Sequence, residues 1–188
     1  MTTFGIAVLD DLTTHDPDTN LVISPYSIAS ALAMTYVGAA GTTATEMALA
    51  LDLPDKDAQG VADAFDAIDL SLAQRSALPS HGFVVQPANA IWGQQNYGWT
   101  PAFIDTLAAD FGAPLVTIDF QTDYTAAIPA INDWVSQKTD GIVPDLLGPS
   151  SLDTHTRIVL VDALTLHGTW LSGFMPMGAE TFHLADGS

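Results

Sequence analysis

The sequence predicts an α+β fold in a single domain that spans residues 1–188. Residues 25–37 form a predicted helix with small or apolar side chains around its whole circumference, and such a helix is buried on every side. Residues 156–166 begin with a nearly continuous apolar run, which is typical of a strand covered on both faces. A helix and a strand that both need this much cover require several layers in one domain.

The first part of the chain is predicted to be mainly helical. Residues 3–14 carry apolar side chains at helical spacing, and a turn over residues 16–20 leads into a short buried strand at 21–24. Ser24 can cap the core helix, and Pro25 suits its first position because the missing N–H costs nothing there.

Glycine and proline positions predict where the following elements start and stop. Gly41 is expected to end the core helix, and Thr42 or Thr43 to begin the next one, which runs to Leu51. Pro87 should place its strand at an edge or a bulge, because proline lacks the N–H that a sheet ladder needs. The remaining expected elements are helices over 60–76, 101–110 and 123–137 and strands over 83–92, 114–120 and 156–166.

Composition excludes several classes of function. The chain has 22 acidic and 4 basic residues, a net charge of −18, and 48% hydrophobic residues. Nucleic acids and anionic membranes both need a basic face, so neither is expected as a partner. The acidic excess fits either a high-salt habitat or simply an acidic protein from an organism with a biased genome.

Cysteine usage and the N-terminus leave the location open. The chain has no cysteine, so disulfides and thiolate metal sites are excluded and the redox compartment is not indicated. The apolar stretch at residues 4–9 is too short and too acid-flanked for a signal peptide, so the protein stays inside the cell or a leader preceded this numbering.

Residues 55–66 scan like a calcium-binding loop, which we interpret as a decoy. Glutamine stands at the fifth position and aspartate replaces the bidentate glutamate at the twelfth. In a chain this rich in aspartate, a solvated helix start is favoured over calcium. The matching positions are Asp55, Asp57, Gln59, Gly60, Asp63 and Asp66.

The sequence contains no recognisable catalytic set. It has five histidines but no HExxH pair, no nucleophile elbow around a serine, and no phosphate-binding glycine loop. We therefore expect neither an enzyme nor a metal or cofactor site. The four tryptophans are interpreted as packing anchors: Trp92, Trp99, Trp134 and Trp170.

The segment 20–54 resembles the serpin family closely, through the pattern N-x-x-x-S-P-x-S-I-x-x-A-L-x-M-x-x-x-G-A-x-G-x-T-x-x-E-M. The likeness continues at ANAIW (88–92), at 131–147 and at 157–174, so it covers the chain from end to end. Residues that carry the later matches include Asn132, Trp134, Thr139, Gly141, Gly168, Trp170 and Phe174.

The resemblance implies a serpin-like fold, in which N-terminal helices pack on a large mixed or antiparallel central sheet. A complete serpin is far longer, so the chain is expected to be its N-terminal half, with the C-terminal half missing. The resemblance also implies a cluster that controls sheet opening, called the shutter, formed by Ser24, Ser27, Asn89 and Asp162. Asp162 departs from the family's asparagine, and an ionised carboxylate only accepts hydrogen bonds.

The function implied by the resemblance is suicide inhibition of a serine protease. The protease cleaves a reactive-centre loop, which then inserts into the main sheet as a new strand. That loop would lie after Ser188, so the fragment itself is not expected to inhibit. The alternative is a non-inhibitory serpin-like binding protein. The family suggests an extracellular location, and self-association of the fragment is expected.

Overall fold

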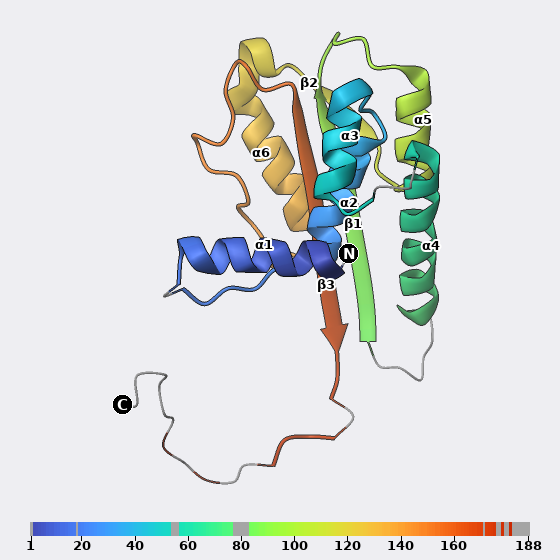
Figure 1. Ribbon diagram of the computed structural model, residues 1–188. Helices are drawn as coiled ribbons and strands as arrows, with labels where there is room; N and C mark the ends of the chain where they lie inside the picture. The colour runs from blue at the N-terminus through green and yellow to red at the C-terminus, as the bar shows by residue number, and fades with distance from the viewer. Residues whose placement is uncertain are drawn as a thin grey trace.

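The computed structural model describes residues 2–17, 19–53, 57–76, 83–170, 172–175, 178 and 181. Within them the chain forms helices first and then alternates strands with helices (Figure 1). The elements are α1 Thr2–His15, α2 Pro25–Tyr36, α3 Gly41–Ala50, α4 Ala58–Ser76, β1 Phe83–Gln94, α5 Pro101–Asp110, β2 Leu115–Ile118, α6 Phe120–Lys138 and β3 Ile158–Gly168.

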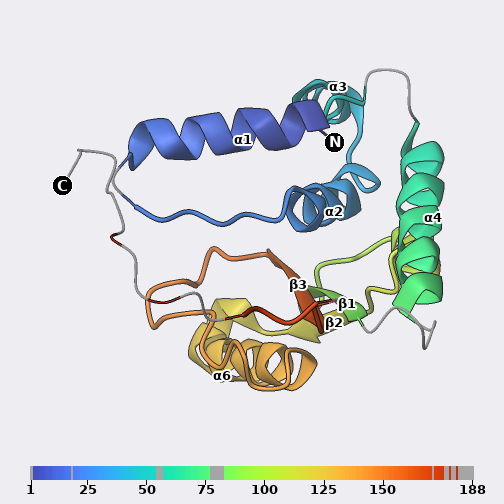
Figure 2. The ribbon, with the colours of Figure 1, turned by 90° about the horizontal axis from the view of Figure 1, so that it is seen from below.

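The sheet is covered on both faces. Figure 2 shows α2 on one side of the strands and α6 on the other, with α1 outside α2. Alternate residues of a strand point to opposite faces, and β3 follows this rule. Ile158 and Leu160 join the apolar cluster that contains α2, while Val159 and Val161 join the cluster that contains α6. The prediction of a strand covered on both faces is therefore confirmed for the first half of β3.

The three strands have the order β2-β1-β3. β1 pairs with β3 in antiparallel fashion along its length and with β2 in parallel fashion only from Ile91 to Gln94. Pro87 therefore pairs with Leu164 on one side, while β2 does not reach it on the other. This position agrees with the edge location that its missing N–H predicts.

Helix α2 is the buried helix that the sequence predicts. None of residues 25–37 is exposed, and the side chains of Ala33 and Met34 are 0% exposed. Helix α1 crosses close over its start, since a Cβ added at Gly5 would lie 2.7 Å from the Pro25 ring. Glycine is required there because any larger side chain would push the two helices apart.

Two local predictions were wrong. Residues 21–24 form no strand, because no strand of the described chain lies beside them to satisfy their backbone groups, and Val22 is 96% exposed. Gly41 begins α3 instead of ending the core helix, which stops at Tyr36. In the described part of the chain, no helix has the length and apolar content needed to cross a membrane.

Candidate functional site

The first turn of α2 brings two of the expected shutter residues to the sheet. Ser24 has an extended backbone and its Oγ accepts a hydrogen bond from the Ser27 backbone N–H at 3.2 Å. This is the N-cap geometry that the sequence predicts, and it fixes where the helix begins. Ser27 then lies one turn along, where its own hydroxyl faces the β3 carboxyl of Asp162.

Asn89 and Asp162 meet across the two long strands. They are direct partners in the antiparallel register of β1 and β3, so their side chains share one face of the sheet. The Asn89 amide donates to the Ser30 hydroxyl of α2 at 3.5 Å. The structure thus brings Ser27, Asn89 and Asp162 together, with Ser24 as the cap that positions Ser27.

Several buried polar atoms of the cluster have no hydrogen-bond partner in the described chain. Over the described residues, the buried side-chain atoms without a partner include Ser27 Oγ, Asn89 Oδ1 and both carboxylate oxygens of Asp162. Asn89 is 7% exposed, so water does not easily supply the missing bonds. Buried polar atoms that lack partners are costly. The carboxyl of Asp162 contributes two of these atoms, and an amide at this position would bring two donors instead.

Tyr26 and Asp69 extend the cluster to α4. The Tyr26 hydroxyl donates a hydrogen bond to Asp69 Oδ1, which ties α2 to α4. Burial, the Asp69 hydrogen bond and the negative charges of Asp69 and Asp162 all raise the pKa of Tyr26. Tyr26 therefore stays protonated and acts as a donor.

Both carboxyl groups have a raised pKa. For Asp162 the main cause is burial, which the Ser27 hydroxyl partly offsets and the negative charge of Asp69 reinforces. For Asp69 burial is again the main cause, opposed by the Tyr26 hydrogen bond and reinforced by Asp66. No lysine, arginine or histidine of the described chain contributes to either shift. The cluster is acidic and lacks a compensating cation there.

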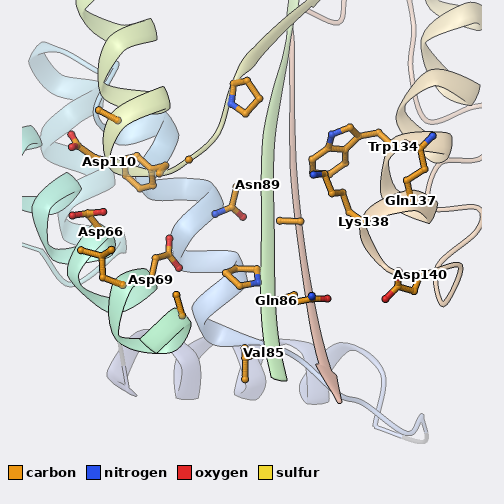
Figure 3. Close-up of a pocket in the computed structure, with 18 residues that line it drawn as sticks. Asp66, Asp69, Val85, Gln86, Asn89, Asp110, Trp134, Gln137, Lys138 and Asp140 are labelled. Atoms are coloured by element: carbon orange, nitrogen blue, oxygen red, sulfur yellow. The ribbon is translucent and has the colours of Figure 1, made fainter. Parts of the chain in front are cut away.

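A cavity of about 730 Å³ opens beside this cluster, along the edge of β1 that β2 does not reach. Figure 3 shows Asp66, Asp69 and Asp110 on one side of β1 and Trp134 and Lys138 on the other. Asn89 points to the side that holds Asp69 (Figure 3). The cavity therefore connects the buried cluster with the surface.

Four of the family-motif residues hold structure away from the cluster. Asn132 donates to the Leu147 carbonyl at 2.9 Å and accepts from the Leu147 N–H at 2.8 Å, so it fastens the loop after α6. Thr139 accepts from the Val143 N–H at 3.1 Å. Gly141 has a φ of +78°, a conformation that favours glycine. Trp134 is partly buried against the α6 apolar cluster.

The other motif residues lie at and beyond the end of β3. Gly168 pairs with Phe83 in the register of β1 and β3. Trp170 and Phe174 are 74% and 79% exposed, and their rings contact each other edge to face at 5.1 Å. The interpretation of Trp170 as a packing anchor is therefore wrong, because most of its side chain is exposed.

The structure describes every position of the calcium-loop match except Asp55. Asp57 Oδ1 accepts a hydrogen bond from the Gly60 N–H at 2.8 Å, as expected for a residue at a helix start. Gln59 and Asp63 are bonded to each other at 2.8 Å. Asp55 lies outside the described residues. Among the residues described, no group of three or more acidic or histidine side chains could hold a metal ion.

Sequence reasoning missed three members of the cluster. Ser30 carries a signal that could have found it, because it lies three residues after Ser27 on the same helical face. Tyr26 and Asp69 are 43 residues apart. No periodicity relates them, so only the three-dimensional arrangement reveals their bond.

The fold and the cluster define a class of protein that comparison with known proteins identifies. The sequence model described as "Serpin (serine protease inhibitor)" matches residues 1–188. The chain is 31% identical over 174 residues to the human (Homo sapiens) leukocyte elastase inhibitor, covering 93% of this chain and 44% of that protein. The chain belongs to the serpin family.

Solved structures give the same answer. The serine protease inhibitor (serpin) 12 of Manduca sexta matches with a TM-score of 0.85 at 27% identity, covering 100% of this chain and 50% of its own. Ovalbumin from emu (Dromaius novaehollandiae) matches with a TM-score of 0.81 at 27% identity, covering 92% of this chain and 46% of its own. The chain thus spans about half the length of the relatives it matches.

Proposed function

We propose that this chain is the N-terminal half of a serpin whose parent inhibits a serine protease by a suicide mechanism. In that mechanism the protease cleaves a loop that lies beyond residue 188, and the loop inserts beside β3 as a new strand. The observation that carries the proposal is the family match over the whole chain. The proposed role requires neither an enzymatic activity of this chain nor a cofactor.

The outer edge of β3 supports the insertion step. In the order β2-β1-β3, only β1 pairs with β3 among the described strands, so the other side of β3 offers backbone groups to a further strand. Toward the C-terminal end of β3, Leu164 is 38% exposed and Leu166 is 69% exposed. An apolar strand edge of this kind needs a partner.

The proposal predicts that the 188-residue chain alone does not inhibit. Incubation with trypsin, chymotrypsin and elastase should leave all three active and give no covalent complex on denaturing electrophoresis. The human leukocyte elastase inhibitor serves as the positive control, because it is a relative of full length. A covalent complex with the 188-residue chain would contradict the proposal.

A chimera tests the inhibitory role directly. Residues 1–188 are joined to the C-terminal half of the human leukocyte elastase inhibitor, and the product is incubated with elastase. We expect a covalent complex that survives denaturing electrophoresis, and none with elastase whose active-site serine has been blocked. A chimera that folds cooperatively but is only cleaved would contradict an inhibitory role for this half of the domain.

The alternative, a non-inhibitory serpin-like binding protein, is favoured by one observation. Asp162 leaves two buried carboxylate oxygens unpaired, within the described chain, at the position where the family has asparagine. Because a buried polar group without a partner is costly, it changes the free energy needed to move β3. A chimera that is cleaved without forming a complex, and that regains complex formation as Asp162→Asn, would assign the non-inhibitory character to this residue.

A further inference from the structure

Asn89 and Asp162 lack a hydrogen-bond donor between them, and one added proton would supply it. The two residues face each other across β1 and β3. Asn89 uses its amide N–H to donate to Ser30, and it leaves its carbonyl oxygen, Oδ1, without a partner in the described chain. The carboxylate of Asp162 has no hydrogen to offer that oxygen when it is ionised. Two acceptors therefore meet across the strand pair. The Ser27 hydroxyl lowers the pKa of Asp162, so it faces the carboxyl and leaves Asn89 Oδ1 without a donor.

We propose that Asp162 holds a proton in the folded protein and donates it to Asn89 Oδ1, so that β1 and β3 are joined by a neutral hydrogen bond that ionisation breaks. The proton satisfies one oxygen on each residue at once. It also removes a charge from a half-buried position, where an unpaired charge is costly. The inference concerns proton binding alone and does not depend on protease inhibition.

Asp69 and Tyr26 give the two carboxyl groups different roles. The Tyr26 hydroxyl donates to Asp69, which stabilises the ionised form of Asp69. The negative charge of Asp69 in turn raises the pKa of Asp162. Of the two carboxyl groups, Asp69 is therefore the one that ionises and accepts the phenol, and Asp162 is the one that keeps the proton.

The other charged groups around the cluster do not change this assignment. On the packed helices, the acidic side chains of α1 are exposed, and Asp66 of α4 adds a negative charge next to Asp69. Asp110 of α5 lines the same side of the cavity, and Lys138 at the end of α6 and Asp140 just after it lie across β1 from Asp69 (Figure 3). The basic groups of α4 and β3 are exposed near the far ends of these elements: Arg75 and His167.

The sign of the pH dependence follows from the direction of the shift. The pKa of Asp162 is raised from the ordinary aspartate value of 3.8. On raising the pH, the unfolded chain releases this proton first and the folded chain later. Protonated Asp162 therefore contributes its full share to the free energy of unfolding below pH 3.8. This contribution is lost as the pH rises through the pKa of Asp162 in the folded protein. Acidification should strengthen this part of the fold.

Asp162→Asn is the direct test, because its amide donates to Asn89 at every pH. We measure urea unfolding of the wild type and the variant between pH 4 and pH 8. At pH 7 the unfolding equilibrium constant of the variant should be smaller by about tenfold for each unit by which the folded pKa exceeds 3.8, counted no further than pH 7. The difference should shrink toward pH 4.

Matched variants separate the proton from net charge. Asp133→Asn removes an exposed carboxylate from α6 and is the control for the change in net charge. Asp69→Asn should lower the pKa of Asp162 and so reduce the advantage of Asp162→Asn. A variant Asp162→Asn that is no more stable than Asp133→Asn at pH 7, or whose advantage persists unchanged at pH 4, overturns the proposal.

A spectroscopic titration gives an answer that does not depend on unfolding. The carboxyl carbon resonance of Asp162 is assigned in ¹³C-labelled wild-type protein by its loss in Asp162→Asn. We expect its midpoint above the ordinary aspartate value of 3.8, and a lower midpoint in Asp69→Asn. A midpoint at or below 3.8 overturns the proposal even if every variant folds.

Discussion

Asn89 on β1 and Asp162 on β3 are direct cross-strand partners, and neither satisfies the other. The carbonyl oxygen of Asn89 and both carboxylate oxygens of Asp162 are buried without a partner in the described chain. Their neighbours Tyr26 and Asp69, by contrast, share a hydrogen bond. Buried side-chain atoms without a hydrogen-bond partner, over the described residues, thus include atoms of β1, of β3 and of the first turn of α2.

Loss of the N-cap of α2 should lower the free energy of unfolding, because the cap fixes the helix start that carries Ser27. Ser24→Ala removes the acceptor for the Ser27 N–H, and loss of an N-cap costs about 0.5–2 kcal/mol. Ser24→Thr keeps a hydroxyl and should cost much less. Urea unfolding at pH 7 measures both. Equal stability of Ser24→Ala and the wild type would show that the cap does not hold the helix start.

Asn132 should be one of the most sensitive positions in the chain. Its side chain makes two hydrogen bonds to the Leu147 backbone, and truncation leaves both backbone groups without partners. Asn132→Ala should therefore lower the free energy of unfolding by about 2–4 kcal/mol. The neighbouring exposed variant Asp133→Ala should change it by less than about 0.5 kcal/mol. Similar values for the two variants would contradict this role.

Gly93 should not tolerate even one extra methyl group. A Cβ at this position of β1 would lie 2.7 Å from Trp99 and 2.9 Å from Leu115. Overpacking of this kind costs about 1–3 kcal/mol. Gly148→Ala is the control, because the nearest atom, Ser151 Oγ, is 4.0 Å from the added carbon. Thermal unfolding should separate the two variants, and equal midpoints would show that Trp99 moves aside at no cost.

Sequence reasoning located most elements because their signals are local. The cap and proline before α2, the apolar stripe of α6 and the apolar run of β3 each depend on residues close together in the chain. The strand at 21–24 failed because a strand depends on a partner that local residues do not specify. Likewise, the family pattern pointed to Asp162, but its position opposite the unpartnered carbonyl oxygen of Asn89 emerges only from the register of β1 and β3.

Asp119 should give a pH dependence opposite to that of Asp162. Its carboxylate caps α6 and accepts hydrogen bonds from Thr122, Gln94 and Gln121. These bonds lower its pKa, and the Thr122 hydroxyl has the largest effect. A lowered pKa contributes stability above the unfolded value of 3.8, and that stability is lost as the pH falls through the folded value.

The variant Asp119→Asn tests this sign. Its destabilisation relative to the wild type should be present at pH 7 and should diminish below pH 3.8. Unfolding curves of both proteins over that pH range provide the measurement, and Asp105→Asn on α5 serves as the exposed control. A destabilisation that is the same at pH 7 and at pH 3 would assign it to packing instead of to ionisation.

The isolated chain should self-associate through the region at and after the end of β3. Leu166, Trp170, Phe174 and Met175 are 69%, 74%, 79% and 84% exposed, and exposed apolar surface of this extent promotes association. The net charge of −18 opposes association, and salt screens that repulsion. The weight-average mass in sedimentation equilibrium should therefore rise with both protein and salt concentration.

A pair of variants locates the contact. The double variant Leu166→Thr with Trp170→Ser should lower the mass toward that of the monomer, because it removes apolar surface at the end of β3. Leu70→Thr on α4 removes a leucine that is 53% exposed and should leave the mass unchanged. A wild-type chain that remains a monomer at high salt and melts cooperatively would contradict this prediction, because it would show that these side chains are tolerated in water.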